Sequence, residues 1–118
     1  MRHETREIKV VRGLAAYDVA MEAVVSTLKA LDGLRGPADL VDQARRAAIS
    51  IPLNIAEGAG RRGRDRKYHF SIALGSTKEV MAALELMFRL DMIAESTFHD
   101  LITLLDRLGG LLAGLTRM

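Results

Sequence analysis

The chain has 118 residues, of which 49% are hydrophobic, so we expect one folded domain over residues 1–118 rather than a disordered segment. It contains no cysteine, which excludes disulfides and thiolate metal sites, and only two prolines, which suits a mostly helical protein. Its 17 basic and 15 acidic residues leave a net charge of +2, so local clusters of charge are more informative than the total.

The N-terminal sequence contains no recognisable targeting signal. MRHETREIKVVRGL lacks an uninterrupted apolar stretch, and Asp18 and Glu22 interrupt the next apolar segment, so we expect no signal peptide. No apolar run approaches the roughly 18 residues that a membrane span needs. Together with the lack of cysteine, these features predict a cytoplasmic protein that has no membrane partner.

The first predicted helix follows a short arm. Residues 1–12 are charged and partly alternating, and we interpret them as an extended or frayed N-terminal arm. From Gly13 onward, apolar residues recur at steps of three and four, which is one face of an α-helix. Gly33 and the pair Gly36-Pro37 end this helix and begin the next. The apolar face of the first helix comprises Leu14, Tyr17, Met21, Val24, Leu28 and Leu31.

The second predicted helix reaches about Ala59 and contains Pro52 in its interior. Proline has no N–H for the carbonyl of Ala48, and its ring crowds that carbonyl, which costs about 3 kcal/mol in a regular helix. We therefore expect a kink near Ser50. Ser50 and Asn54 can bond the freed backbone groups, and the alternative is that both face solvent. The inner face comprises Leu40 or Val41, Ala44, Ala47 or Ala48, Ile51 and Ile55.

The third predicted helix runs from near Asp65 to about Asp91. Gly75 in its interior costs about 1 kcal/mol relative to alanine. A close approach by a neighbouring helix would explain this glycine, and simple tolerance is the alternative. Asp91, Met92 and Ile93 form a short connector. The core stripe of this helix comprises Phe70, Ala73 or Leu74, Thr77, Val80 or Met81, Leu84 and Met87 or Phe88.

The fourth predicted helix is capped by Ser96 and points Phe98, Leu101, Ile102, Leu105, Leu108, Leu112 and Leu115 inward. Four amphipathic helices with short loops predict an all-α, up-down-up-down antiparallel four-helix bundle. The apolar arc is wider than one buried seam requires, because the last two helices add Ile72, Leu86, Leu90, Leu104 and Leu111. Monomers seldom expose large contiguous apolar patches, so we expect a homo-oligomer.

No stretch of the sequence indicates a reaction. Gly58, Gly60 and Gly63 have the spacing of a dinucleotide-binding loop, but a helix precedes them where that motif needs a strand. We interpret them as ending the second helix in a left-handed cap and reversing the chain. Glu95 and His99, at i and i+4, have no matching pair elsewhere, so we interpret them as surface side chains. We therefore expect no enzyme activity, no metal and no cofactor.

A cluster of basic residues follows the second helix, and it comprises Arg61, Arg62, Arg64, Arg66 and Lys67. Arg45 and Arg46 lie at the edge and on the outer face of that helix. Such a patch can neutralise phosphates, bind without regard to sequence and weaken steeply with salt. The alternative is that the arginines complement a helix C-terminus and keep a turn soluble, with Glu57 and Arg61 as a surface pair.

The same stretch carries a resemblance to a known family. RRAAISIP at 45–52, NIAEG at 54–58, GRR at 60–62 and ALGS at 73–76 closely resemble the four helix bundle protein family. Its members include proteins encoded in intervening sequences of bacterial 23S ribosomal RNA genes, and a related branch is the accessory variability protein of diversity-generating retroelements. The resemblance covers nearly the whole chain, and its motif includes Ser50, Pro52, Asn54, Glu57, Gly58 and Gly75.

The resemblance implies a bacterial four-helix subunit that assembles into a ring-like homopentamer. For the retroelement branch it implies a basic surface that binds nucleic acid and a reverse transcriptase, and for other members it implies no established activity. The basic positions of the motif are Arg45, Arg46, Arg61 and Arg62 in this chain. The chain departs from the family in lacking a tryptophan near Val10, and in having Gly63 where a serine often caps the next helix. The second departure leaves that helix start less firmly capped.

Two functions therefore remain open at the level of sequence. The first is an oligomeric accessory protein that binds RNA or DNA without sequence specificity. Its binding residues would be Arg45, Arg46, Arg61, Arg62, Arg64, Arg66 and Lys67. The alternative is a structural or protein-interaction module whose ring docks a protein partner, for example a reverse transcriptase.

Overall fold

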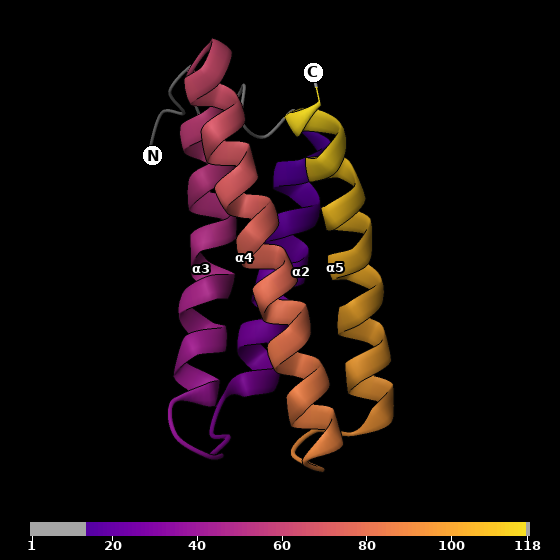
Figure 1. Cartoon of the computed structure of the whole chain (residues 1–118). Helices are drawn as coiled ribbons and strands as arrows, with labels where there is room; N and C mark the ends of the chain where they lie inside the picture. Colours follow the sequence, from indigo (N-terminus) through magenta and orange to yellow (C-terminus); the bar gives the residue numbers. More distant parts are fainter. Residues whose placement is uncertain (1–13, 118) are drawn as a thin grey trace, which may run out of the picture.

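A computed structural model gives the fold of residues 14–117. These residues form four α-helices and no strand: α2 (Ala15–Leu31), α3 (Leu40–Ala59), α4 (Gly63–Arg89) and α5 (Glu95–Thr116). Consecutive helices are joined at alternating ends of the molecule (Figure 1), which is the arrangement of an up-and-down bundle. The predicted all-α class is confirmed. The predicted N-terminal arm, residues 1–12, lies outside the described residues.

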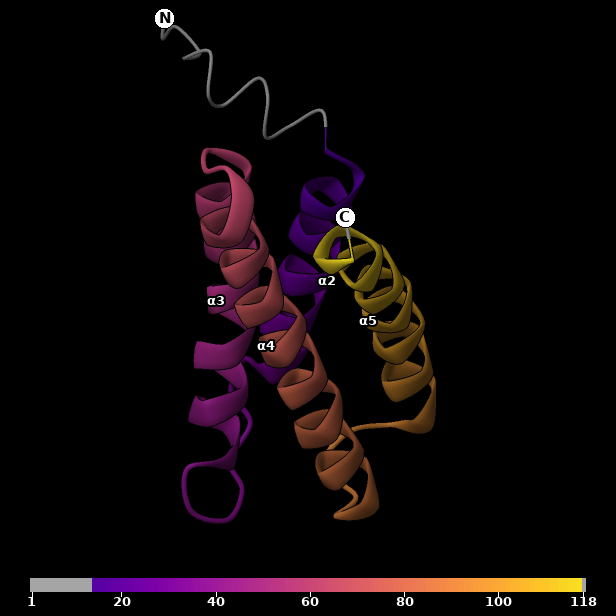
Figure 2. The same ribbon diagram turned by 45° about the horizontal axis from the view of Figure 1, so that its top comes forward.

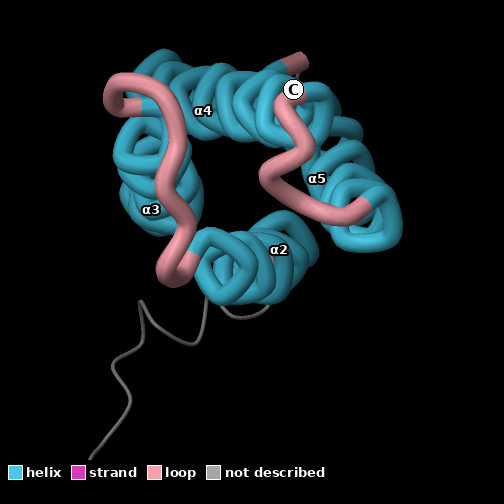
Figure 3. Tube along the Cα trace, turned by 90° about the horizontal axis from the view of Figure 1, so that it is seen from below, coloured by secondary structure: helices cyan, strands magenta, loops and turns pink. Residues whose placement is uncertain are grey.

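The four helices enclose one core. Each packs on two neighbours, since α2 and α4 both contact α3 and α5, and the end-on view shows the resulting ring of helices (Figure 3). The buried face of α5 is made of leucines, whereas the adjoining α2 buries mainly small side chains, so the two faces fill the space between them. Within residues 14–117, no helix is both long and apolar enough to cross a membrane.

The predicted core stripes are confirmed on α3 and α4 and in part on α2, where Val24 and Leu31 are buried and Leu14 packs against the core. Met21, predicted to face inward, is 42% exposed, and Tyr17 and Leu28 are half-buried. The physical reason is that alanines, which a search for large apolar residues passes over, form the contact with the neighbouring helices. The buried residues of α2 are Ala16, Val19, Ala20, Ala23, Val24, Thr27 and Leu31.

The start of α5 also differs from the prediction. Its N-cap is Ala94, which makes no side-chain cap bond, and the helix begins at Glu95, so the predicted cap at Ser96 is wrong. An aromatic contact lies close to this end instead: the rings of Phe88 and Phe98 stack with their centroids 4.8 Å apart and their planes 4° from parallel. Packing against α4 therefore accompanies this helix start in place of a polar cap.

Ser50 and Asn54 connect α3 to α4, and Asn54 also bonds a backbone carbonyl near Pro52. The Ser50 and Ser76 hydroxyl oxygens are 2.6 Å apart. Asn54 Nδ2 donates to the Ser50 carbonyl at 3.0 Å, and Asn54 Oδ1 lies 3.1 Å from His69 Nδ1. The predicted backbone bond is found for Asn54, at the Ser50 carbonyl rather than that of Ala48, whereas the alternative that both side chains face only solvent is wrong. The helix itself continues through Pro52, and the kink expected there stays a prediction.

Some of the glycines have roles other than those predicted. A Cβ on Gly58 would lie 2.8 Å from Phe70 Cε1 and 3.2 Å from the Arg66 carbonyl oxygen, so the close approach of α4 to α3 occurs at Gly58. A Cβ on Gly75 would meet open space within the described chain, which fits the alternative of simple tolerance and not a close approach. Gly60, the C-cap of α3, has a φ of −87°, so the predicted left-handed cap is wrong. The positive φ, +58°, belongs to Gly63 at the start of α4.

Candidate nucleic-acid interface

The turn between α3 and α4 carries most of the predicted basic residues. It lies at the end of the bundle where the described chain reaches its C-terminus (Figures 1 and 2). The Arg61 amide donates to the Gly58 carbonyl at 3.0 Å, and α4 begins at Gly63 with a positive φ. Because glycine adopts this conformation without steric cost, the chain reverses within a few residues. Helix α4 therefore begins directly beside the end of α3.

Arg61 is held between two carboxylates. Its Nη2 lies 2.8 Å from Glu57 Oε2, and its Nη1 lies 3.3 Å from Asp65 Oδ2. The hydrogen bond to Glu57, the charge of that carboxylate and the charge of Asp65 raise the pKa of the Arg61 guanidinium. The predicted Glu57–Arg61 pair is confirmed. Since Asp65 also joins, Arg61 links the end of α3 to the start of α4, and its charge is largely compensated.

Two further arginines contact the C-terminal carbonyls of helices. Arg66 Nη1 donates to the Ala59 carbonyl at 3.4 Å, near the end of α3, and its guanidinium carbon lies 4.9 Å from the centroid of the Phe70 ring. Arg45 Nη2 donates to the Leu31 carbonyl at 3.5 Å, at the end of α2. A cation at a helix C-terminus satisfies a free carbonyl and complements the helix dipole. For Arg45 and Arg66, these contacts support the alternative in which the arginines complement helix C-termini rather than bind phosphates.

Three basic residues of the turn point their charge into solvent. Arg62, Arg64 and Lys67 are exposed, and no ion pair joins them to another residue in 14–117. We call these three residues the basic tip. They flank the start of α4, whose N-cap residue, Arg62, makes no side-chain hydrogen bond to the helix. The sequence predicted this weaker capping from the glycine at position 63. Side chains without a carboxylate partner can approach a phosphate without first breaking an ion pair.

The predicted seven-residue patch is not one cluster in space. Arg46 is exposed but lies thirteen positions before Ala59, the last residue of α3, which is roughly 20 Å at 1.5 Å per residue. Arg45 lies one position further back. The structure therefore brings together Arg61, Arg62, Arg64, Arg66 and Lys67 and leaves Arg45 and Arg46 along the side of the bundle.

Tyr68 adjoins the basic tip and was missed at the level of sequence. Its side chain is 62% exposed, and its ring meets the His69 ring edge-on, with centroids 5.3 Å apart and an interplanar angle of 71°. The sequence feature that could have identified Tyr68 is its position, as an aromatic residue directly after Lys67. Cations interleaved with aromatic rings are typical of surfaces that bind single-stranded nucleic acid.

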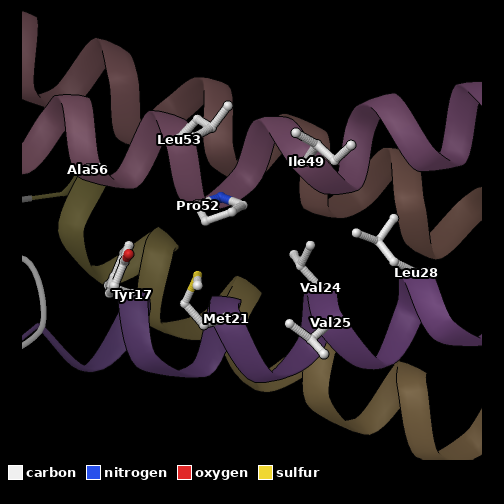
Figure 4. A pocket seen from close by; sticks show the side chains of 9 residues that line it. All are labelled: Tyr17, Met21, Val24, Val25, Leu28, Ile49, Pro52, Leu53 and Ala56. Atoms are coloured by element: carbon white, nitrogen blue, oxygen red, sulfur yellow. The ribbon is translucent and has the colours of Figure 1, made fainter.

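A second surface feature is an apolar groove of about 310 Å³ between α2 and α3. Met21 of α2 and Pro52 of α3 point toward each other across it (Figure 4). Leu53 on its rim is 64% exposed. We call this the α2–α3 groove, and its lining residues are Tyr17, Met21, Val24, Val25, Leu28, Ile49, Pro52, Leu53 and Ala56.

The apolar surface predicted on the later helices is found in part. Leu86 and Leu90 of α4 are each 46% exposed, whereas Ile72 on α4 and Leu104 and Leu111 on α5 are half-buried. The sequence thus indicated surplus apolar surface on α4 but not the α2–α3 groove, because Met21, which lines the groove, was assigned to the core.

Glu95 and His99 are surface neighbours on α5. His99 Nε2 lies 3.8 Å from Glu95 Oε2, and both side chains are exposed. Within the described part of the chain, no group of three His, Cys, Asp or Glu side chains is arranged as metal ligands would be. The pair is therefore a local contact within one helical turn.

Comparison with known proteins relates this bundle to a known family. The sequence profile for 23S rRNA-intervening sequence protein matches residues 12–114. Among solved structures, a protein of unknown function from the S23 ribosomal protein family of Bacteroides thetaiotaomicron matches with a TM-score of 0.80 and 23% sequence identity. The match covers 88% of this chain and 100% of that chain, and it shows the shared fold. No curated protein matches the chain.

Proposed function

This chain belongs to the 23S rRNA-intervening sequence protein family, and from that premise we propose that it is a non-enzymatic accessory protein that binds nucleic acid without sequence specificity. The contacts are made by the basic tip, Arg62, Arg64 and Lys67, with phosphate groups as their targets. The single observation that supports this most is that these three exposed cations lack a carboxylate partner in residues 14–117, at the end of a long helix.

The surroundings of the basic tip favour an anionic ligand. The turn from Glu57 to Lys67 contains five basic residues against two acidic ones, and both acids pair with Arg61 alone. The first N–H groups of α4 lie in the same turn, and free N–H groups at a helix start attract anions. Phosphates would therefore meet side-chain and backbone donors together.

In this proposal the protein acts in the cytoplasm as a homo-oligomer. Its resemblance to the family implies that the oligomer is a pentameric ring. Exposed apolar side chains on α4 and in the α2–α3 groove support association, because such surface is unfavourable in water. A ring would repeat the basic tip in every subunit and so raise the avidity for a long polyanion. The kink expected at Pro52 is part of this proposal, since Pro52 lines the groove.

A salt titration tests the proposal. Binding of a fluorescent RNA and of a DNA duplex of unrelated sequence is followed by anisotropy for the wild type and for the triple variant Arg62→Ala, Arg64→Ala, Lys67→Ala. Each lost phosphate contact should lower the slope of log affinity against log salt by about 0.7–0.9, so the triple variant should lose about two units of slope and at least tenfold in affinity at moderate salt.

The matched control removes the same charge elsewhere, through Lys29→Ala, Lys78→Ala and Arg107→Ala, three exposed cations outside the turn. This control should keep the wild-type slope to within about half a unit. If the triple variant and the control bind alike, the basic tip is not the interface. If the wild type binds neither nucleic acid, the proposed function is wrong.

A second candidate is a module that docks a protein partner. The observation that favours it is the α2–α3 groove, which is apolar and open, with Leu53 exposed on its rim. A reverse transcriptase is the partner that the family resemblance suggests. Nuclease treatment distinguishes the two candidate functions. A partner protein that stays bound after the nucleic acid is digested favours docking. Loss of the partner together with the nucleic acid favours the first candidate.

A further inference from the structure

We propose that Tyr68 is a stacking platform for an unpaired base, so that the basic tip prefers single-stranded RNA or DNA to a duplex. This inference rests on the proposed function and adds the class of nucleic acid. It starts from the exposure of Tyr68, whose side chain is 62% exposed in the second turn of α4 although a tyrosine ring is a large apolar surface.

The positions of the neighbouring cations suit this role. Lys67 directly precedes Tyr68, and Arg64 lies four residues before it on α4, which is the spacing that places two side chains on the same face of a helix. Proteins that bind single strands combine cations that follow the phosphates with rings on which bases stack. Here both kinds of group project from the first two turns of one helix.

A chain of contacts holds the ring next to Tyr68 in place. Asn54 Nδ2 donates to the Ser50 carbonyl at 3.0 Å, and a carbonyl can only accept. The other end of the amide, Oδ1, therefore faces His69 Nδ1 at 3.1 Å, and that nitrogen carries the proton and donates. His69 is thus attached to α3, and its ring meets the Tyr68 ring edge-on at 5.3 Å between centroids.

This support assigns a role to the polar side chains of α3. With His69 fixed from α3, one side of Tyr68 is buttressed, and most of the ring stays in solvent. A platform that is already oriented loses less conformational entropy when a base stacks on it. Ser50 and Asn54, which the sequence singled out near Pro52, would then contribute to binding by positioning His69.

A duplex cannot use such a platform in the same way. Its bases are paired and stacked within the helix, and bringing one onto a protein surface requires unpairing and unstacking. The duplex would therefore contact the cations alone, whereas a single strand would contact the cations and Tyr68. This difference predicts the preference for single strands.

The first test measures anisotropy of a labelled oligothymidylate and of a DNA duplex of equal length with wild type, Tyr68→Ala and Tyr68→Phe. Tyr68→Ala should bind the single strand at least about fivefold more weakly, and Tyr68→Phe should bind like the wild type, because the ring is what stacks. The duplex affinity should change by less than about twofold. His99→Ala, which removes an exposed ring at the start of α5, is the matched control and should behave as wild type.

A second readout reports stacking directly. The chain contains no tryptophan, so Tyr68→Trp introduces a unique fluorophore at the proposed platform. Oligothymidylate should quench its emission, and the duplex should quench it much less. Leu90→Trp places the same fluorophore at an exposed position at the far end of α4 and should not be quenched.

The outcomes separate the two proposals. If the basic-tip triple variant loses binding while Tyr68→Ala binds oligothymidylate as the wild type does, the platform is wrong and the proposed function stands. If neither strand form binds to the wild type, the proposed function fails first. If Tyr68→Ala changes the mass of the protein in solution and leaves nucleic-acid binding unchanged, the ring is a subunit contact and the inference is overturned.

Discussion

At the scale of single residues, the glycines show how one residue type serves different ends. Gly58 is buried where α4 crosses α3, and a Cβ there would lie 2.8 Å from the buried Phe70 ring. Gly75 sits on the exposed side of α4, where a Cβ would meet nothing within 4 Å. The sequence left a close approach and simple tolerance open at Gly75 and did not indicate the close approach at Gly58, because spacing along a helix does not show which face a neighbour covers.

Alanine substitutions at these two glycines should have opposite effects. Gly58→Ala should lower the free energy of unfolding by about 1–3 kcal/mol, because the methyl group overpacks a site that cannot yield. Gly75→Ala should raise it by up to about 1 kcal/mol through helix propensity. Urea denaturation followed by circular dichroism measures both. Shifts in the same direction would show that the helix crossing is not tight at Gly58.

At the scale of elements, the helix ends are held by contacts other than side-chain N-caps. None of α2, α3, α4 and α5 has a side-chain bond at its N-cap. Helix α4 ends in a backbone motif, in which the Asp91 amide donates to the Phe88 carbonyl at 3.0 Å and the Met92 amide donates to the Met87 carbonyl at 2.9 Å. Asp91 takes a φ of +59° there, a conformation that favours glycine.

Replacing this aspartate should stabilise the protein. Asp91→Gly should raise the free energy of unfolding by about 1 kcal/mol, because glycine adopts the left-handed conformation without the steric cost that Asp91 bears. The matched control is Asp106→Gly on the exposed face of α5, which should lower it by about 0.5–1 kcal/mol. Thermal denaturation of both variants gives the comparison, and a destabilised Asp91→Gly variant would contradict this account of the α4 terminus.

At the scale of the whole molecule, charge and apolar surface are separated. The basic tip lies at the α3–α4 end of the bundle (Figure 1), while the α2–α3 groove lies between two helices. In the proposed oligomer, sister chains would pack through apolar surface while the tips remained available for a ligand. The net charge of +2 does not reveal this separation.

Charges placed in the groove should prevent association. Light scattering after size-exclusion chromatography should give the wild type a mass that is a multiple of the 12.9 kDa subunit. The double variant Met21→Glu, Leu53→Glu should shift toward one subunit, because a carboxylate is costly to bury in an apolar contact. Ser96→Glu with Thr103→Glu adds the same charge at exposed positions on α5 and should leave the mass unchanged. A wild type of one subunit would refute the homo-oligomer.

Within residues 14–117, the sequence by itself determined the four helices and most of the core. Helix periodicity is a local property, so the stripe from Phe70 to Met87 and the leucines of α5 could be assigned without knowing their neighbours. The family resemblance could likewise be identified, since its motif is nearly continuous along the chain. On α2 the same method was right in part: Val24 and Leu31 are buried as predicted, but Met21 is exposed and the buried alanines were missed.

The tertiary structure alone decided what each basic and polar side chain does. Arg61, Arg66 and Arg62 are almost adjacent in sequence, yet the first is paired, the second meets the end of α3, and the third is exposed. The contacts of Ser50 with Ser76 and of Asn54 with His69 join residues 26 and 15 positions apart. Such contacts depend on where two helices cross, which is set by the packing of all four helices and not by the local pattern of either one.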